Sequence, residues 1–401
     1  MYYSRRIPSV DLAPLLSAGA AIALAAAFLF VSSPAPARGA GPGLGAVLTT
    51  KDGGQIIGFD IDQSGDDGVL ASAQTIDGNG DVRVSMEVFD QDTGKIVKSF
   101  AKYEGRRNEY GVDGIFSGDV ALITHYVTPK DSIFARRKYK VMNPVAGRKF
   151  TGAWTPPVKD ADVLEWAENQ ATSTSVLYAI ALKKQDNPLL FVSDIAANTF
   201  TNVIKLDPGL FGLQNGPRLG QFTAANQAVL ALSPDGGAVG GEPPVNVLVD
   251  LDTGERTQFS GYNNGFFHAG YVNGLAVDPN TGVAATTTEL NSQVEFYDLA
   301  NRKGLAFAQL PCTSDTDQTN SGSGVAVDPV NKLFLVADQF YCDGSQGSAI
   351  VVYDETGQFV ETITGFNFAI GEPAPALNPS KRMGWAFSGP QGFSQLQQFF
   401  Y

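Results

Sequence analysis

Three oxygen-bearing side chains in one short stretch have the spacing of a cation-binding loop. The segment DGNGD at 77–81 places Asp77, Asn79 and Asp81 at alternate positions, and alternating carboxylate and amide oxygens can wrap a hard cation such as calcium. No glycine follows Asp81, and Val88 stands where such a loop ends on glutamate. A polar turn between two strands accounts for the same residues without a metal, so both interpretations stay open.

A second group of polar side chains lies in segments rich in Asn, Gly and aromatic residues. Its members, the candidate ligand-binding residues, are Arg218, Asn264, His268, Asn320 and Asp338. Amides and carboxylates beside aromatic rings suit a small polar ligand or a peptide. Turn formation by Asn and Gly and packing by Phe explain the same composition. A catalytic or metal-binding histidine needs a partner, and the only other histidine, His125, is expected several blades away. We therefore expect His268 to be structural rather than catalytic.

Motifs for covalent or metal-assisted catalysis are missing from the sequence. It contains no GxSxG, no HExxH and no glycine-rich phosphate loop in a strand-to-helix context. We therefore expect a module that binds a ligand or a protein without catalysis, and no cofactor beyond a possible calcium ion.

The only two cysteines, Cys312 and Cys342, are 30 residues apart. An even pair in an exported chain most often forms a disulfide, and closing a loop of this length would stabilise the fold by about 3 kcal/mol. No CxxC spacing is present, which argues against a redox role. Two thiols are also too few for a structural zinc site without histidine partners.

The elements that would position these residues repeat about every fifty residues. An apolar run, an Asp or Asn, a turn and a second β-rich run recur with spacings of 53, 51, 56, 48 and 56 residues. The turn residues are Asp90, Asn143, Asp194, Asp250, Asp298 and Asp354. Each unit is typical of a β-hairpin. With 44 Gly, 22 Pro and only 17% charged residues, the composition favours an all-β protein rich in turns.

A second hairpin precedes several of these units and carries a proline-containing turn. It occurs as LALSPDGGAV (230–239), GLAVDPNTGVAAT (274–286), GVAVDPVNKLFLV (324–336) and ALNPSKRMGWAF (376–387). Each period then holds four short strands, the content of one propeller blade. The run GLGAVLTT at 43–50 can complete the short last unit, so we expect seven blades closed by an N-terminal strand, with six or eight as alternatives.

The segment GVAVDPVNKLFLVADQ…SAIVVYDETGQFVETI resembles the repeats of NHL and YVTN-type β-propellers, and the similarity covers about 274–365. That resemblance implies a propeller fold and leaves function open, since such repeats serve enzymes and binding scaffolds alike. An alternative is a metal-dependent lactonase or hydrolase that resembles gluconolactonase. Its candidate divalent-ion ligands are Glu289, Asn264, Asn320 and Asp338.

In a propeller, the loop leading into the innermost strand and the loop between strands two and three lie at the same end. The predicted blades therefore bring Cys312 near Cys342, and the candidate ligand-binding residues near one another, at one mouth of the ring. We refer to this end as the upper end and to the opposite end as the lower end.

The N-terminal region has the features of a targeting segment. Arg5 and Arg6 precede an uncharged apolar run at 15–31, and small residues follow it, as in a cleaved signal peptide at 1–40. The 17-residue run is at the short end of a membrane span, so an uncleaved anchor is the alternative. We expect residues 41–401 to form one propeller domain that is secreted or periplasmic.

The charge of the chain bears on its partners. The formal net charge is −13, and removing residues 1–40, with three Arg and one Asp, leaves −15. A chain this acidic is not expected to bind nucleic acid by general attraction. The basic group at 136–149 fits a solvated blade face or the docking of an anionic partner. A monomer is expected.

Overall fold

The computed structural model describes the strands of the repeat and many of its turns. The described residues are 42–50, 53–63, 65–75, 81–106, 112–117, 120–127, 136–142, 150–154, 157–158, 161–169, 174–181, 184–194, 199–206, 218–222, 226–232, 245–260, 272–288, 293–310, 321–342, 345–366, 374–388 and 395–401. Within these ranges every regular element is a β-strand. No helix in the described part of the chain is long and apolar enough to cross a membrane.

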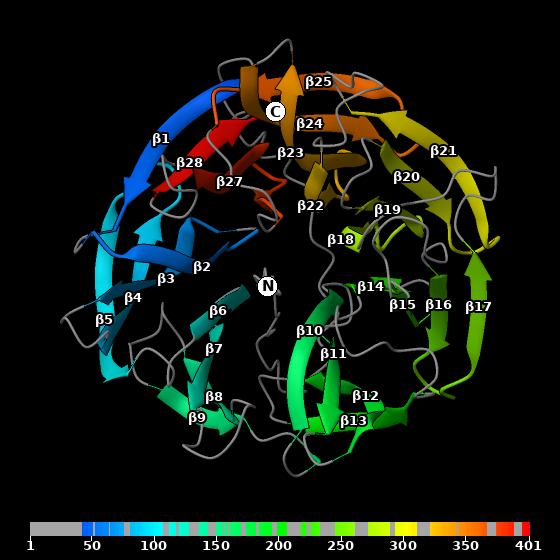
Figure 1. Ribbon diagram of the computed structural model, residues 1–401, viewed down its shortest axis with the longest axis horizontal. Helices are drawn as coiled ribbons and strands as arrows, with labels where there is room; N and C mark the ends of the chain where they lie inside the picture. The colour runs from blue at the N-terminus through cyan, green and yellow to red at the C-terminus, as the bar shows by residue number, and fades with distance from the viewer. Residues whose placement is uncertain are drawn as a thin grey trace, which may run out of the picture.

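The described strands form seven four-stranded sheets arranged as blades around a centre (Figure 1). Blade 1 contains β2 (Gln55–Ile61), β3 (Asp67–Thr75), β4 (Asp81–Asp90) and β5 (Ile96–Arg106). Blade 2 contains β6 (Val112–Ser117), β7 (Val120–Val127), β8 (Arg136–Met142) and β9 (Phe150–Trp154). Blade 3 contains β10 (Ala161–Asn169), β11 (Thr174–Ala181), β12 (Lys184–Asp194) and β13 (Thr199–Lys205).

The remaining blades follow in chain order. Blade 4 contains β14 (Arg218–Phe222), β15 (Gln227–Leu232), β16 (Val245–Asp250) and β17 (Arg256–Ser260). Blade 5 contains β18 (Val272–Val277), β19 (Val283–Thr288), β20 (Gln293–Asp298) and β21 (Lys303–Gln309). Blade 6 contains β22 (Ser321–Asp328), β23 (Leu333–Cys342), β24 (Ser345–Asp354) and β25 (Phe359–Thr364). Blade 7 contains β26 (Ala376–Asn378), β27 (Met383–Ser388), β28 (Gln395–Phe400) and β1 (Gly43–Thr49).

Each of blades 1 to 6 is an antiparallel meander whose strands pair in sequence order, and the all-β propeller class predicted from the sequence is confirmed. In blade 7 the outer strand is β1, which comes from the other end of the described chain and pairs antiparallel with β28. Two hairpins predicted from their turn residues, at Asp298 and Asp354, are β20–β21 and β24–β25. Local pairing explains this agreement, because a meander needs only neighbouring segments to meet.

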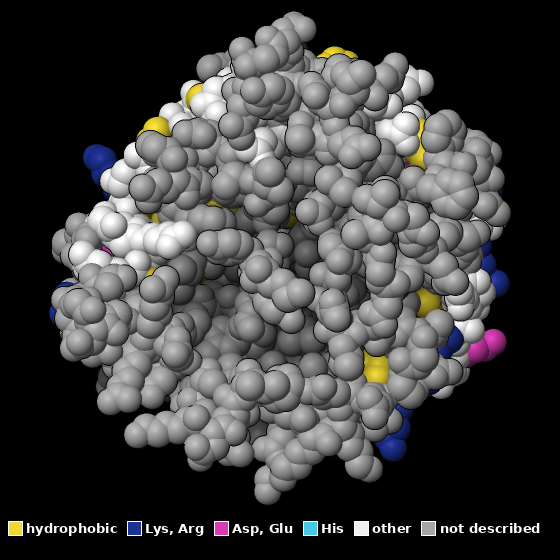
Figure 2. Space-filling view, in the orientation of Figure 1, with side chains coloured by type: hydrophobic (Ala, Val, Ile, Leu, Met, Phe, Trp, Pro, Cys, Tyr) yellow, Lys and Arg dark blue, Asp and Glu magenta, His cyan; other side chains and the backbone are white. Residues whose placement is uncertain are grey.

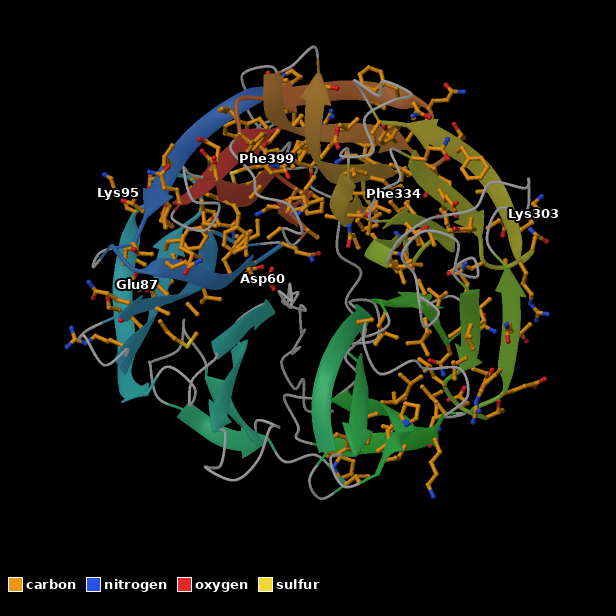
Figure 3. All side chains as sticks on the ribbon, in the orientation of Figure 1. Asp60, Glu87, Lys95, Lys303, Phe334 and Phe399 are labelled. Atoms are coloured by element: carbon orange, nitrogen blue, oxygen red, sulfur yellow. The ribbon has the colours of Figure 1, made fainter. Side chains whose placement is uncertain are left out.

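The core lies between the faces of adjacent blades. On β24, Val351 and Tyr353 pack against blade 5, while Ile350 and Val352 pack against blade 7. Both faces of the strand are therefore buried, which is why SAIVVY reads as a continuous apolar run rather than an alternating one. Across blades 5 and 6, the rings of Phe296 and Phe334 meet edge to face with centroids 5.5 Å apart; Phe334 is labelled in Figure 3.

The junction of blades 7 and 1 is bridged by buried polar contacts around Gln91. Its Nε2 donates to the carbonyl oxygens of Asp62 (2.7 Å) and Asp67 (2.6 Å). Its Oε1 accepts from Asn378 Nδ2 (3.0 Å), and its backbone carbonyl accepts from Gln398 Nε2 (2.7 Å). The β1–β28 ladder lies within blade 7, whereas these side-chain bonds join blade 7 to blade 1.

Aspartates close the outer turns at the lower end. Asp250 Oδ1 accepts from both the amide and the hydroxyl of Thr253, each at 2.7 Å, and these bonds hold the pKa of Asp250 below its ordinary value. Gly254 then adopts φ of 75°, a left-handed conformation that disfavours a Cβ. In the equivalent turn after Asp298, the residue at this position is Arg302, with φ of 55°.

Candidate functional site

The two ends of blade 6 differ in what they carry. Its lower end holds the turns after Asp328 and Asp354, closed by their own carboxylates. At its upper end, β22 begins, β23 ends and β24 begins, and Asp338 lies there in register with Gly322 and Ala349. The predicted ligand-binding residue Asp338 therefore sits on the second strand of a blade, close to the upper mouth.

Asp338 is fully buried, and among the described residues neither of its carboxylate oxygens has a hydrogen-bond partner. Its side chain lies on the same face of β23 as Phe334 and Val336, because alternate residues of a strand share a face. Phe334 and Val336 pack against blade 5, so the carboxylate is enclosed between blades 5 and 6. Native buried polar groups are almost always paired, which makes this carboxylate an exception that needs an explanation.

The neighbours of Asp338 on this face are small, hydroxylic or aromatic. Ala349 lies directly opposite on β24, and Tyr353 follows four residues later on the same face. The hydroxyl of Tyr353 donates to the carbonyl oxygen of Gln309, 2.9 Å away. On the facing strand β19, Thr287 is fully buried and shares its face with Ala285, which packs toward blade 6.

Burial raises the pKa of the Asp338 carboxyl from the usual 3.8 to about 7. The physical cause is desolvation, which disfavours the charged form. Burial, with the nearby Asp338 as a secondary cause, likewise raises the pKa of Tyr353 above its ordinary value. At neutral pH the Asp338 carboxyl is thus close to balance between its neutral and charged forms, and a nearby positive charge would favour the charged one.

A second buried acid, Glu295 on β20, was not singled out from the sequence. The hydroxyl of Tyr297 donates to Glu295 Oε2, and the hydroxyl of Thr286 donates to Tyr297 Oη at 3.1 Å. Burial raises the pKa of Glu295 from 4.5 to about 8. An acidic residue inside the apolar run VEFYD could have indicated a buried acid from the sequence. It was overlooked because that run was interpreted only as one strand of the repeat.

A third acid at the lower end was also missed. Asp278 is fully buried, and its Oδ1 accepts from the amide of Asn280 (2.7 Å). Burial and the neighbouring carboxyl of Glu355 raise the pKa of Asp278 to about 6. Glu355 in turn accepts from the hydroxyl of Thr281 at 2.7 Å. The Thr281–Glu355 hydrogen bond joins blades 5 and 6 at their lower end. Asp278 therefore lies at the opposite end of the blades from Asp338.

The other predicted site residues are only partly within the described chain. Outside it lie Asp77, Asn79, Asn264, His268, Glu289, Cys312 and Asn320. Arg218, Asp81 and Cys342 are described as strand residues, at the start of β14, the start of β4 and the end of β23, without their side chains. The ligand set, the calcium loop and the disulfide therefore stay predictions. The signal segment at 1–40 also falls outside the described residues.

Among the described residues, no group of three or more His, Cys, Asp or Glu side chains could hold a metal ion. Asp338 and Glu295 lie on different faces of their blades, since Glu295 shares a face with Tyr297, which packs toward blade 4. The two carboxyls whose pKa values are raised are thus separate buried groups and do not form one acid–base pair.

Comparisons with known proteins support the fold and do not identify a function. No protein-family model matches the chain, and none of the curated proteins matches it. Matches to solved structures are numerous, at 648 chains, so the architecture is widespread and does not indicate one function. One is the crystal structure of RRP9 WD40 repeats, with a TM-score of 0.51, 13% identity, and coverage of 89% of this chain and 99% of that chain. The chain therefore has the β-propeller fold of repeat proteins.

Proposed function

We propose that this protein is an exported propeller that binds a small polar ligand or a peptide at the upper end of blades 5 and 6, without catalysis. The observation that carries the proposal is Asp338, a fully buried carboxylate for whose two oxygens the described part of the chain provides no hydrogen-bond partner. Leaving such a group unpaired is unfavourable by about 1–3 kcal/mol or more. A bound ligand would satisfy it, and propeller loops at one end commonly form binding mouths.

The family-level part of the proposal rests on sequence. The repeat at 274–365 is similar to NHL and YVTN-type repeats, and the turns DPNTG and DPVNK start at equivalent positions, Asp278 and Asp328, each accepting backbone amides through its Oδ1. Export is supported by the charged, apolar and small-residue segments at 1–40. The WD40 neighbour supports the fold alone.

The test is a ligand screen read out at the proposed site. Free amino acids, short peptides and sugars are added to the full chain, and melting temperature and amide hydrogen exchange are measured. We expect at least one compound to raise the melting temperature and slow exchange in Ser321–Asp328 and Leu333–Cys342. The Asp338→Asn variant should weaken that binding at least tenfold.

Two outcomes count against the proposal. If the compounds that bind slow exchange only in blades 1 to 3, the site is elsewhere. If mass spectrometry finds the bound compound converted to product, or a lactone hydrolysed in a manner lost on EDTA treatment, the protein is an enzyme of the alternative class. Recovery of the compound unchanged supports a binding function.

A further inference from the structure

The contrast between two buried aspartates of blade 6 indicates what Asp338 lacks. Asp328 is also fully buried, yet its Oδ1 accepts from the amides of Val330 and Asn331, each at 2.9 Å. Its Oδ2 accepts from Asn331 Nδ2 at 2.7 Å and from the hydroxyl of Tyr401 at 2.9 Å. The chain thus supplies donors for both oxygens of the buried Asp328, whereas the described residues supply none for Asp338.

The donors nearest to Asp338 in the register are already used. Its backbone is paired in the ladder with Gly322 and Ala349, and the Tyr353 hydroxyl proton is directed at the Gln309 carbonyl. Beside the carboxylate, this face presents the apolar side chains of Val336, Ala349 and Val351, and the facing strand β19 adds the buried Thr287. The described surroundings are thus short of donors for an anion, which a complementary partner would have to bring.

The chain's own described cations lie elsewhere. In the view of Figure 2, the visible described Lys and Arg side chains lie on the outer perimeter of the ring, and Lys303 is an example at the end of an outer strand (Figure 3). Within the described part of the chain, no positively charged group offsets the desolvation of Asp338. The compensating charge for an ionised Asp338 would therefore come from a bound partner.

We propose that the Asp338 carboxylate binds a positively charged nitrogen group of the ligand, a primary ammonium or a guanidinium. The inference rests on the proposed function of this end of the propeller and names the ligand class for it. A charged N–H donor forms the short, strong bonds that a buried carboxylate lacks.

A nitrogen cation fits these surroundings better than a divalent metal. Calcium takes six to eight oxygen ligands. The described face instead offers one carboxylate, the buried Thr287 and the apolar neighbours Val336, Ala349 and Val351, and the described residues include no trio of metal-ligating side chains. Full burial of Asp338 favours a slender alkyl chain that ends in the charge. A free alkylamine and a lysine side chain of a peptide share this chemistry.

The inference implies a pH dependence of binding. Asp338 must be ionised to hold a cation, and burial raises its pKa to about 7. The described titratable neighbour is Tyr353, whose own pKa is raised by its burial and by the charge of Asp338. Affinity should therefore fall about tenfold for each pH unit below 7 and level off above it. A carboxyl with a purely structural role would give no such profile.

The experiment titrates the full chain with putrescine, agmatine, the peptide Gly-Lys-Gly, 1,4-butanediol and calcium chloride by calorimetry at pH 5.5, 6.5 and 8. We expect binding of at least one nitrogen cation, none of the matched neutral diol, and weakening below pH 7. Asp338→Asn should lower the affinity at least tenfold. Glu295→Gln, which neutralises a different buried carboxyl, should retain it. Free amines and the peptide then distinguish the two sources of the cation.

Several results would overturn the ligand class. Equal binding to Asp338→Asn and the unchanged chain, equal binding of the diol, or a calcium response sensitive to Asp338→Asn each contradicts it. If no cation binds while a neutral or anionic compound from the ligand screen does, the class is wrong and the binding function stands. If nothing in either panel binds, and Asp338→Asn is merely more stable at pH 8, the carboxyl is a protonated core group and both proposals fail.

Discussion

Replacing Glu295 by glutamine should make the stability of this protein less sensitive to alkali. Glu295 lies on β20, accepts a hydrogen bond from the Tyr297 hydroxyl and is almost completely buried. Glutamine keeps the shape and an acceptor oxygen for Tyr297, but it does not ionise. The substitution therefore removes the titration of one buried group and little else.

The size of the effect follows from the pKa, which burial raises from 4.5 to about 8. Between these values the unfolded chain releases a proton that the folded chain keeps, so the free energy of unfolding falls as pH rises. The slope is about 1.4 kcal/mol per pH unit, which gives an upper bound of about 5 kcal/mol across the window. Above pH 8 both the folded and the unfolded chain have released the proton, so the free energy of unfolding falls no further on account of Glu295.

The assay is urea unfolding, followed by tryptophan fluorescence and circular dichroism, between pH 5.5 and pH 9. Since the isoelectric point is about 4.6, more acidic solutions would favour precipitation. Relative to the unchanged chain, Glu295→Gln should gain about 3 kcal/mol between pH 5.5 and pH 9. Glu255→Gln, on an exposed turn, controls for the loss of a surface carboxylate. A stability difference that is constant across this range would refute the reasoning.

Four further predictions concern backbone, core and closure. Arg302→Gly should raise the free energy of unfolding by at most about 1 kcal/mol, because φ of 55° is relieved; a lower melting temperature would contradict it. Leu48→Ala removes a buried side chain from the junction of blades 7 and 1 and should destabilise by about 2–5 kcal/mol, while exposed Val47→Ala serves as control with little change in urea midpoint. Gln91→Leu leaves several buried polar groups unpaired, which costs about 1–3 kcal/mol for each. The melting temperature should therefore fall clearly, and an unchanged melting curve would show that the hydrogen bonds of Gln91 contribute nothing to stability. Deleting residues 1–50 removes β1 and its ladder with β28, so calorimetry should show a lower and broader transition, and an identical one would disprove the importance of this pairing.

The fold could be predicted from local sequence because each blade is built from neighbours in the chain. In VVYDETGQFVETI, β-branched residues form both strands and Asp354 closes the turn through bonds to Thr356 and Gln358. Nothing distant is needed to specify that hairpin. The proline-containing turns at Asp278 and Asp328 have the same local origin, with Oδ1 of each accepting backbone amides within three residues.

The candidate site could be predicted only in part. Asp338 was identified as a polar residue at the upper end of a strand, and its place there agrees with the register. Its complete burial and lack of partners depend on how blade 5 covers blade 6, which no local pattern encodes. Glu295 and Asp278 were missed for the same reason, since an acid in a strand or turn looks solvated until a neighbouring blade covers it.

By itself, the sequence determined the hairpins, their period and the β-propeller class, because short-range strand pairing and turn chemistry are set by adjacent residues. Only the tertiary structure decided which acidic side chains are desolvated. Desolvation depends on the packing of one blade face against the next, and that packing raises the pKa of Asp338 and Glu295 while Asp250, on an exposed turn, keeps a lowered one. Chemically identical side chains in similar strands and turns thus acquire different properties from contacts made far apart in the chain.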